Sequence, residues 1–452
     1  MDEPTAPMDE PTPPAAAPGQ SVLGAVGAGL GRGFWTLFSA SLLANLADGI
    51  FQVALPLLAA SLTRDPGLVA GVSFASRLPW LVFALIAGAL ADRFDRRRTM
   101  VLVDAGRVIV LTALVLAVLG NAASVWLLYV AAFILGCFET MFDTAASSML
   151  PNVVGTDRIV AANSRLNAVE QTMNSFVGPP IGGFLVAIGI ATAFGTAAAG
   201  YLGALLCLLL LAGSFRPHRA AEGSSIRGDI TDGLRYLFAH RLLRTLAFVV
   251  GPMNLASSAV FAVVVLWVVA PGPLGLDSVG YGLLITSISL GTVTGTLLAS
   301  RFERVLGRAN LFVACIGSLL ISDIVWLLVG QPILIALILA VSSTVGGAFN
   351  VVFGSIRQRI VPNHLLGRVM ASFRVISWGS LPLGALLGGL VGQAFGLPAV
   401  FVAAAVIHVI LLGSRLVLTD AFMDQVERHA AETAANVANA DNAARAASTA
   451  PG

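Results

Sequence analysis

The chain has 452 residues, of which 57% are hydrophobic and only 11% are charged. Ordinary soluble domains carry about 25% charged residues, and no soluble fold could cover so much apolar surface. We therefore expect lipid to be the solvent for most of the chain. The formal net charge of +2 gives no basis for nucleic-acid binding.

The first segment, residues 1–33, is rich in proline and begins with two near copies of the sequence Met-Asp-Glu-Pro-Thr. Asp2 and Glu3 stand where a secretory signal peptide needs basic residues, so this segment is not predicted to be one. Its composition predicts a disordered cytoplasmic tail.

Apolar runs of the length that a hydrocarbon core of ~30 Å requires follow this tail. Twelve of them lie near 34–61, 68–91, 99–119, 125–149, 164–187, 193–215, 244–270, 279–300, 309–328, 332–356, 376–394 and 398–418. The sequence thus predicts an all-α membrane protein with twelve transmembrane helices.

The loops after every second run carry the arginines, whereas the alternate loops carry only Arg64. Positively charged loops stay on the cytoplasmic side of a membrane. This asymmetry predicts that both termini are cytoplasmic.

The longest connection, residues 216–243, separates a first half at 34–215 from a second half at 244–418. Within it, one helical face carries Ile230, Leu234, Leu237 and Phe238, which predicts a helix lying in the cytoplasmic interface. The last segment, 419–452, is polar and alanine-rich without a sustained apolar stripe. It is predicted to be a cytoplasmic tail, either a frayed helix or disordered.

A charged loop between the second and third runs, Gly88–Arg98, places six charges in the seven residues from Asp92 to Arg98. Part of it recurs 208 positions later, where Ala-Ser-Arg-Phe-Glu-Arg at 299–304 repeats Ala-Asp-Arg-Phe-Asp-Arg at 91–96. Other pairs recur as well, such as Gly182-Gly183 and Gly388-Gly389. The repeat predicts two pseudo-symmetric six-helix bundles with a cavity between them.

The loop resembles the loop 2–3 motif of the major facilitator superfamily, G-x-L-A-D-R-x-G-R-[KR], with Asp95 in place of the second glycine. The closer resemblance is to the bacterial drug and siderophore exporter branch. It is carried by Glu139-Thr-Met-Phe-Asp143, Ile360-Val-Pro362 and Gly367-Arg368-Val369.

In the fifth run, Gly178-Pro179-Pro-Ile-Gly182-Gly183 resembles a motif of the superfamily's antiporters, with Asn174 in place of an upstream glycine. The resemblance implies export in exchange for protons. The alternative is that these residues only allow close helix packing and a bend.

Ionisable groups inside spans are costly and persist where they pair, line water or act in function. Asp48 forms one polar stripe with Asn45 and Gln52, and Glu170 forms another with Asn174. We expect Asp48 and Glu170 to couple transport to protons, partly because of the resemblance. The alternative for both stripes is a structural hydrogen-bond network.

Other polar groups in spans are expected to line the substrate cavity or to stabilise the bundles. Glu139, Arg77 and Arg374 are candidates for the cavity, the arginines either as substrate counter-ions or as partners of the acids. Asp104 and Arg107 are three residues apart and are predicted to form an ion pair. Asp323 and His408 are interpreted as isolated side chains that are satisfied locally or reach the interface.

The resemblance also implies a gate at the charged loop. Arg96 would pair with Asp143, and Asp92 would cap a helix of the second half, where the helix N-terminus favours an anion. Gly88 and Arg93 would belong to the same gate. These contacts would lock the cytoplasmic side in the outward-facing state and break on switching. The alternative is that the loop charges act as topology signals alone.

Together these features predict a secondary active transporter, not an enzyme, that exports a small amphipathic molecule in exchange for protons by alternating access. A Walker-type nucleotide motif is absent, and no cofactor or metal is expected. Expected partners are the substrate, protons and the lipid of a bacterial inner membrane, with no nucleic acid and with the monomer as functional unit. The alternatives are a metabolite importer or facilitator of the same fold, or a non-transporting receptor or scaffold.

Overall fold

The computed structural model describes residues 30–82, 95–154, 158–211, 226–429 and 432. These residues are almost entirely helical, and within them the only β-type pairing is an isolated bridge between Val269 and Leu276. An all-helical chain suits a lipid environment, because a helix satisfies its backbone hydrogen bonds internally.

The first half contains α1 (Gly31–Leu62), α2 (Pro66–Val82), α4 (Arg96–Leu119), α5 (Val125–Val154), α6 (Ile159–Glu170), η2 (Gln171–Val177), α7 (Gly178–Ile188) and α8 (Ile190–Leu210). The second half contains α9 (Ile226–Ala239), α10 (Arg241–Val268), α11 (Ser278–Leu306), α12 (Arg308–Leu328), α13 (Pro332–Ile360), α14 (Asn363–Phe395), α15 (Leu397–Leu412) and η3 (Gly413–Leu416).

Ten of the described helices are long and apolar enough to cross a membrane. The other two predicted spans correspond to α2, described over 17 residues, and to the fifth run, which is divided among α6, η2 and α7. The eleventh span is longer than predicted. Its helix α14 begins at Asn363, directly after its N-cap Pro362, rather than near residue 376. The helix therefore starts before the apolar run from which the span was predicted.

The fifth span is not a regular α-helix. Its prolines indicated a bend, but the sequence did not predict the form that the structure shows. Its middle, η2, is a π-helix in which the Gly178 N–H bonds the Met173 carbonyl. Pro179 and Pro180 have no N–H to donate, so the carbonyls four residues before them lack their usual partners. A wider π turn accommodates this gap, and such turns occur often at functional sites.

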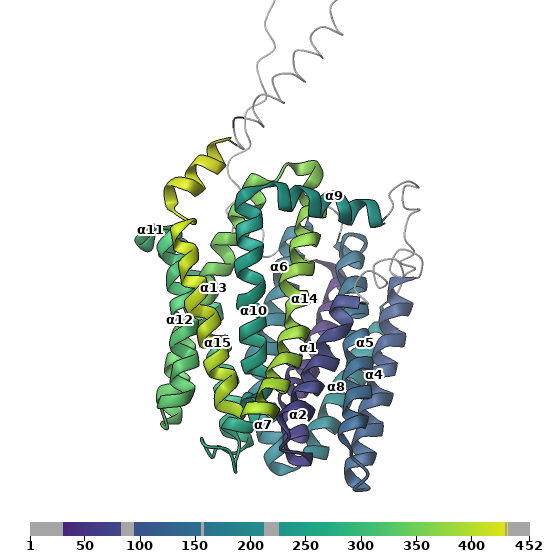
Figure 1. Ribbon diagram of the computed structural model, residues 1–452. Coiled ribbons are helices and arrows are strands. Elements are labelled where there is room, and N and C mark those ends of the chain that lie inside the picture. Colours follow the sequence, from purple (N-terminus) through teal and green to yellow (C-terminus); the bar gives the residue numbers. More distant parts are fainter. Residues whose placement is uncertain (1–29, 83–94, 155–157, 212–225, 430–431, 433–452) are drawn as a thin grey trace, which may run out of the picture.

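The helix α9 lies at one end of the molecule, and we call the opposite end the far end (Figure 1). Hydrogen bonds join the two halves at the far end. There Arg64 donates to the carbonyls of Val269 and Ala270, and the Gln393 amide donates to the Asp65 carboxylate at 2.8 Å. Arginine asymmetry predicts that the far end is extracellular.

The glycine pairs of the internal repeat have matching positions in the two halves. A Cβ on Gly182 would lie 2.9 Å from the Ile50 carbonyl oxygen of α1 in its own bundle, whereas one on Gly183 would lie 2.4 Å from the Ser278 carbonyl oxygen of α11 across the interface. Gly388 and Gly389 repeat this arrangement against α10 and α2. In each half, the first glycine therefore packs the bundle and the second joins it to the other bundle.

The linker helix α9 packs across the beginning of α14 (Figure 1). A Cβ on Gly233 would lie 2.4 Å from the Arg368 carbonyl oxygen, so this contact requires glycine. Leu237 on the predicted apolar face is buried, whereas Phe238 is 41% exposed. Only part of the apolar face of α9 therefore packs against the rest of the protein.

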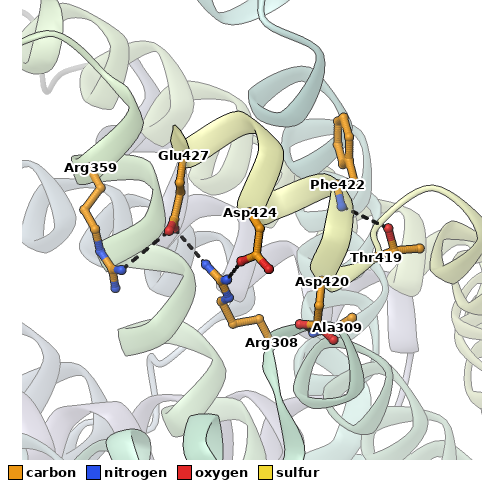
Figure 2. Close-up of polar contacts among 8 residues, drawn as sticks. All are labelled: Arg308, Ala309, Arg359, Thr419, Asp420, Phe422, Asp424 and Glu427. Atoms are coloured by element: carbon orange, nitrogen blue, oxygen red, sulfur yellow. Dashed lines mark hydrogen bonds and ion pairs between the residues drawn. The ribbon is translucent and has the colours of Figure 1, made fainter. Parts of the chain in front are cut away.

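Part of the C-terminal segment is buried, which corrects the sequence-based interpretation. That interpretation found no apolar stripe long enough to require burial. Residues 420–429 are helical, and Leu418 and Met423 are fully buried. Figure 2 shows the acidic face of this helix against the ends of α12 and α13. Arg308 forms ion pairs with Asp424 and with Glu427, and Asp420 accepts the Ala309 N–H at 3.0 Å.

We expect Met423→Ala to destabilise the second half by about 2 kcal/mol, because it empties a fully buried site. The thermal unfolding midpoint of the purified protein in detergent would fall by several degrees. Glu432→Ala, at an exposed position, is the control and should leave the midpoint unchanged. Equal midpoints for both variants would show that the C-terminal helix does not stabilise the protein.

Candidate functional site

A cavity of about 230 Å³ lies between the two bundles. Its polar lining comes from the first half and includes five residues predicted from the sequence: Asp48, Gln52, Arg77, Glu139 and Asn174. These residues belong to α1, α2, α5 and η2, so the tertiary structure collects them from four elements.

The cavity also has aromatic walls, which the sequence-based interpretation missed. Phe51 and Trp80 come from the first half, and Phe261 and Tyr281 come from α10 and α11 of the second. Aromatic residues in apolar spans give no signal by themselves, because they usually pack in the interior. Here they complete a site whose lining combines polar and aromatic side chains.

Asp48 is the acid of α1 that contacts this cavity, and it is partly exposed. The hydroxyl of Tyr201, from α8, donates to its Oδ1 at 2.5 Å. Tyr201 was not predicted, although the chain has only four tyrosines. A tyrosine in the middle of an apolar helix was the available signal, since a buried phenol hydroxyl needs a partner.

The predicted pair of Asp104 and Arg107 is confirmed, with Nη1 of Arg107 3.4 Å from Oδ1 of Asp104. Both side chains are fully buried within the first bundle rather than in the cavity. The Arg107 guanidinium lies 4.8 Å from the centre of the Tyr201 ring and 5.1 Å from that of Phe142. The pair therefore lies directly behind the Asp48 carboxylate.

Three predicted site residues lie outside the cavity lining. The Asn45 amide donates to the Ser41 carbonyl at 2.8 Å within its own helix. Glu170 is exposed at the end of α6, close enough to Asp48 for an electrostatic interaction. Arg374 lies 5.2 Å from the Trp378 ring, which contacts Trp80 of the other half at 5.3 Å between ring centres.

The predicted gate is described only in part. Gly88, Asp92 and Arg93 lie outside the described residues. Asp95 is the N-cap of α4, where its carboxylate accepts the Arg98 N–H at 3.1 Å.

Arg96 and Asp143 are both described, but no ion pair joins them in this structure. The prediction expects that pair only in the conformation that is closed at the α9 end. In this structure hydrogen bonds join the halves at the far end, and the pairing of Arg96 with Asp143 stays a prediction.

The antiporter-like motif packs α7 against α1. A Cβ on Gly178 would lie 2.6 Å from the Gly49 Cα, and one on Gly49 would lie 2.6 Å from the Asn174 carbonyl oxygen. The two backbones touch directly at this point. Pro179 contributes its carbonyl oxygen to the contact with Gly282 of α11.

Asp323 and His408 are not isolated, contrary to the sequence-based interpretation. His408 Nδ1 lies 2.7 Å from Asp323 Oδ2, and both residues are buried between α12 and α15. The two residues belong to different helices, so no spacing in the sequence indicated that they form a pair. His408 and Tyr201 are each the twelfth residue of their helices, α15 and α8, so both halves place a polar ring at this position.

We expect His408→Leu to destabilise the second bundle by about 3 kcal/mol, because it leaves Asp323 buried without a partner. Replacing both residues by leucine should recover most of this loss. The comparison requires thermal unfolding of the two variants and of Asp323→Leu in the same detergent. Additive losses in the double variant would mean that the two side chains are energetically independent.

Two repeated helical bundles around a shared polar cavity are the architecture of a major facilitator superfamily transporter. Residues 30–445 match the family model described as transmembrane secretion effector, and the chain belongs to this family. It is accordingly a multi-pass membrane transporter and not an enzyme.

Two of the relatives that the chain resembles are exporters. The multidrug efflux pump Tap of Mycobacterium tuberculosis (strain ATCC 25618 / H37Rv) is 32% identical over 401 residues, which cover 83% of this chain and 90% of Tap. The enterobactin exporter EntS of Shigella boydii serotype 4 (strain Sb227) is 26% identical over 388 residues, covering 85% of this chain and 91% of EntS.

Solved structures share the fold. The nucleoside transporter NupG matches with a TM-score of 0.68 at 14% identity, over 86% of this chain and 99% of NupG. A bacterial homologue of ferroportin in an inward-facing state matches with a TM-score of 0.68 at 13% identity, over 88% of this chain and 99% of that one.

Proposed function

We propose that this transporter exports a small amphipathic molecule from a bacterial cell across the inner membrane, in exchange for protons. The observation that carries the proposal is the partly exposed Asp48 carboxylate in a cavity between the two bundles. A carboxylate that water can reach from the cavity can take up and release a proton. The efflux functions of Tap and EntS support the outward direction.

The lining supports a cationic or neutral amphipathic cargo. The lining holds the two carboxyl groups of Asp48 and Glu139 and the one guanidinium of Arg77, so acidic groups outnumber basic ones. The aromatic walls offer faces that attract cations and pack against apolar groups. Drug-like or siderophore-like molecules combine such features.

Alternating access is the proposed mechanism. The bundles meet where α2 packs on α14 and where α7 packs on α11, and glycine contacts and hydrogen bonds join them at the far end. Movement of one bundle against the other would break these contacts without unfolding either bundle. Arg96 and Asp143, with Gly88, Asp92 and Arg93, would then close the α9 end. Asp48, together with Glu170, would bind the proton that drives the exchange, and one chain would suffice for the cycle.

Inverted membrane vesicles test direction and coupling together. We expect an imposed proton gradient, acidic inside, to drive uptake of cationic dyes into inverted vesicles containing the protein. Right-side-out vesicles with the opposite gradient, acidic outside as at the cell surface, should exclude the dyes. Uptake into inverted vesicles at the same rate without the gradient would contradict proton exchange. Accumulation in right-side-out vesicles with an acidic exterior would favour an importer. A panel of dyes, macrolides and siderophores in a pump-deficient host would then define the cargo.

A further inference from the structure

Asp48 is held from behind by a side chain of another helix. The Tyr201 hydroxyl donates to its Oδ1 at 2.5 Å, while the carboxylate still borders the cavity. Tyr201 is 2% exposed and belongs to α8, which packs along α1. Its phenol is thus inaccessible to substrate but in direct contact with the acid that faces the substrate.

The ring of Tyr201 is fixed in turn by Arg107. The guanidinium lies over the ring at 4.8 Å from its centre and forms the ion pair with Asp104 at 3.4 Å. A buried cation at this distance polarises the phenol and makes its hydroxyl a better hydrogen-bond donor. Asp104, Arg107, Tyr201 and Asp48 therefore form one chain of contacts across α4, α8 and α1.

We propose that Tyr201 is a positioning residue for Asp48, which orients the carboxylate and stabilises its deprotonated form, with Arg107 holding the phenol in place. This inference rests on the proposed function, in which Asp48 carries the coupled proton. A hydrogen bond donated to a carboxylate favours the charged state. Tyr201 would thereby set the pH at which Asp48 releases its proton into the cavity.

Other ionisable groups also face Asp48 from the helices around it. They are Asp104 and Arg107 on α4, Glu139 and Asp143 on α5, and Glu170 on α6. Four of these five groups are carboxyl groups and one is a guanidinium, and the electrostatic interaction of each with Asp48 acts through space. Tyr201 is the residue that hydrogen-bonds its carboxylate in the described part of the chain.

The test is Tyr201→Phe, which removes the hydroxyl and keeps the ring under Arg107. Protonation of Asp48 would be followed by infrared titration of the purified full-length protein in liposomes. The carboxyl band is assigned by its loss in Asp48→Asn. We expect the midpoint to move to higher pH by about one unit, the size that a lost hydrogen bond to a charged group supports.

Tyr129→Phe is the matched control. It removes a phenol hydroxyl from the same bundle, where that group donates to the Leu68 carbonyl at 2.8 Å and not to an acid. Its midpoint should equal that of the wild type. A wild-type midpoint in Tyr201→Phe, or a move to lower pH, would overturn the inference.

A second variant removes any dependence on how well Tyr201→Phe folds. Site-specific replacement of Tyr201 by 3-fluorotyrosine keeps the packing and makes the hydroxyl a stronger donor, so the midpoint should move to lower pH. An unchanged midpoint here would also overturn the inference.

Transport separates this inference from the proposed function. Proton-driven transport that persists in Asp48→Asn would refute the coupling role of Asp48. The titration shift in Tyr201→Phe would still stand as a property of the carboxylate. Conversely, the wild type could show proton-driven transport while Tyr201→Phe leaves the titration midpoint of Asp48 unchanged. That result would refute only the role of Tyr201.

Discussion

Asp48→Asn is expected to abolish proton-driven efflux while leaving the protein folded in the membrane. Asparagine has nearly the same shape as aspartate and can still accept a hydrogen bond from the Tyr201 hydroxyl, but it cannot bind and release a proton. Efflux energised by a proton gradient should fall to the level of vesicles without transporter. Efflux down a substrate gradient alone should persist, because that movement needs the cavity and not the proton.

The control for this prediction is Asp277→Asn. Asp277 is exposed and caps α11 by accepting the Gly280 N–H at 2.7 Å, and asparagine is as good an N-cap as aspartate. This variant makes the same chemical change outside the cavity, so it should transport as the wild type does. Proton-driven efflux by Asp48→Asn at the wild-type rate would remove Asp48 from the coupling mechanism.

Gly183→Val is expected to prevent the bundles from closing at the far end. The structure places the Cβ of any other residue 2.4 Å from the Ser278 carbonyl oxygen, a backbone atom that cannot move by itself. Overpacking of this kind costs about 1–3 kcal/mol. Because the contact crosses between bundles, we expect the protein to avoid the clash by opening the far end and to populate the opposite conformation.

Closure can be measured by cross-linking cysteines introduced at Asp65 and Gln393. These side chains are hydrogen-bonded at 2.8 Å across the far end, and the three native cysteines would first be replaced. Gly183→Val should slow cross-linking about tenfold, the effect of about 1.4 kcal/mol on the conformational equilibrium, which lies within that range. Gly195→Val is the control, because a Cβ there meets nothing within 4 Å. Cross-linking at the control rate would show that the clash is relieved inside the first bundle.

Local sequence patterns predicted contacts correctly where both partners lie on the same helix. They also predicted close helix packing where the residue type alone, such as glycine, decides it. Asp104 and Arg107 are adjacent on one helical face at a spacing of three, and the structure pairs them. The glycines at 178, 182 and 183 indicated close helix approach, and the structure places backbone within 3 Å of each hypothetical Cβ.

Patterns failed where the partner lies far away in the chain. Asp323 and His408 are 85 residues apart, and Tyr201 and Asp48 are 153 apart, so neither pair has a periodic signature. The burial of the C-terminal helix was not predicted for the same reason. Its acids face Arg308 and Arg359 of other helices, and its burial depends on Met423 rather than on a long apolar stripe.

The sequence by itself determined the membrane environment, the family and the repeat that builds two halves. Each of these follows from composition, from apolar run length or from short motifs that do not need a partner. Only the tertiary structure decided which polar groups form the cavity and which support it. Helix packing places Gln52 and Arg77 in the lining and Asn45 outside it, and packing between α1, α4 and α8 brings Tyr201 and Arg107 behind Asp48.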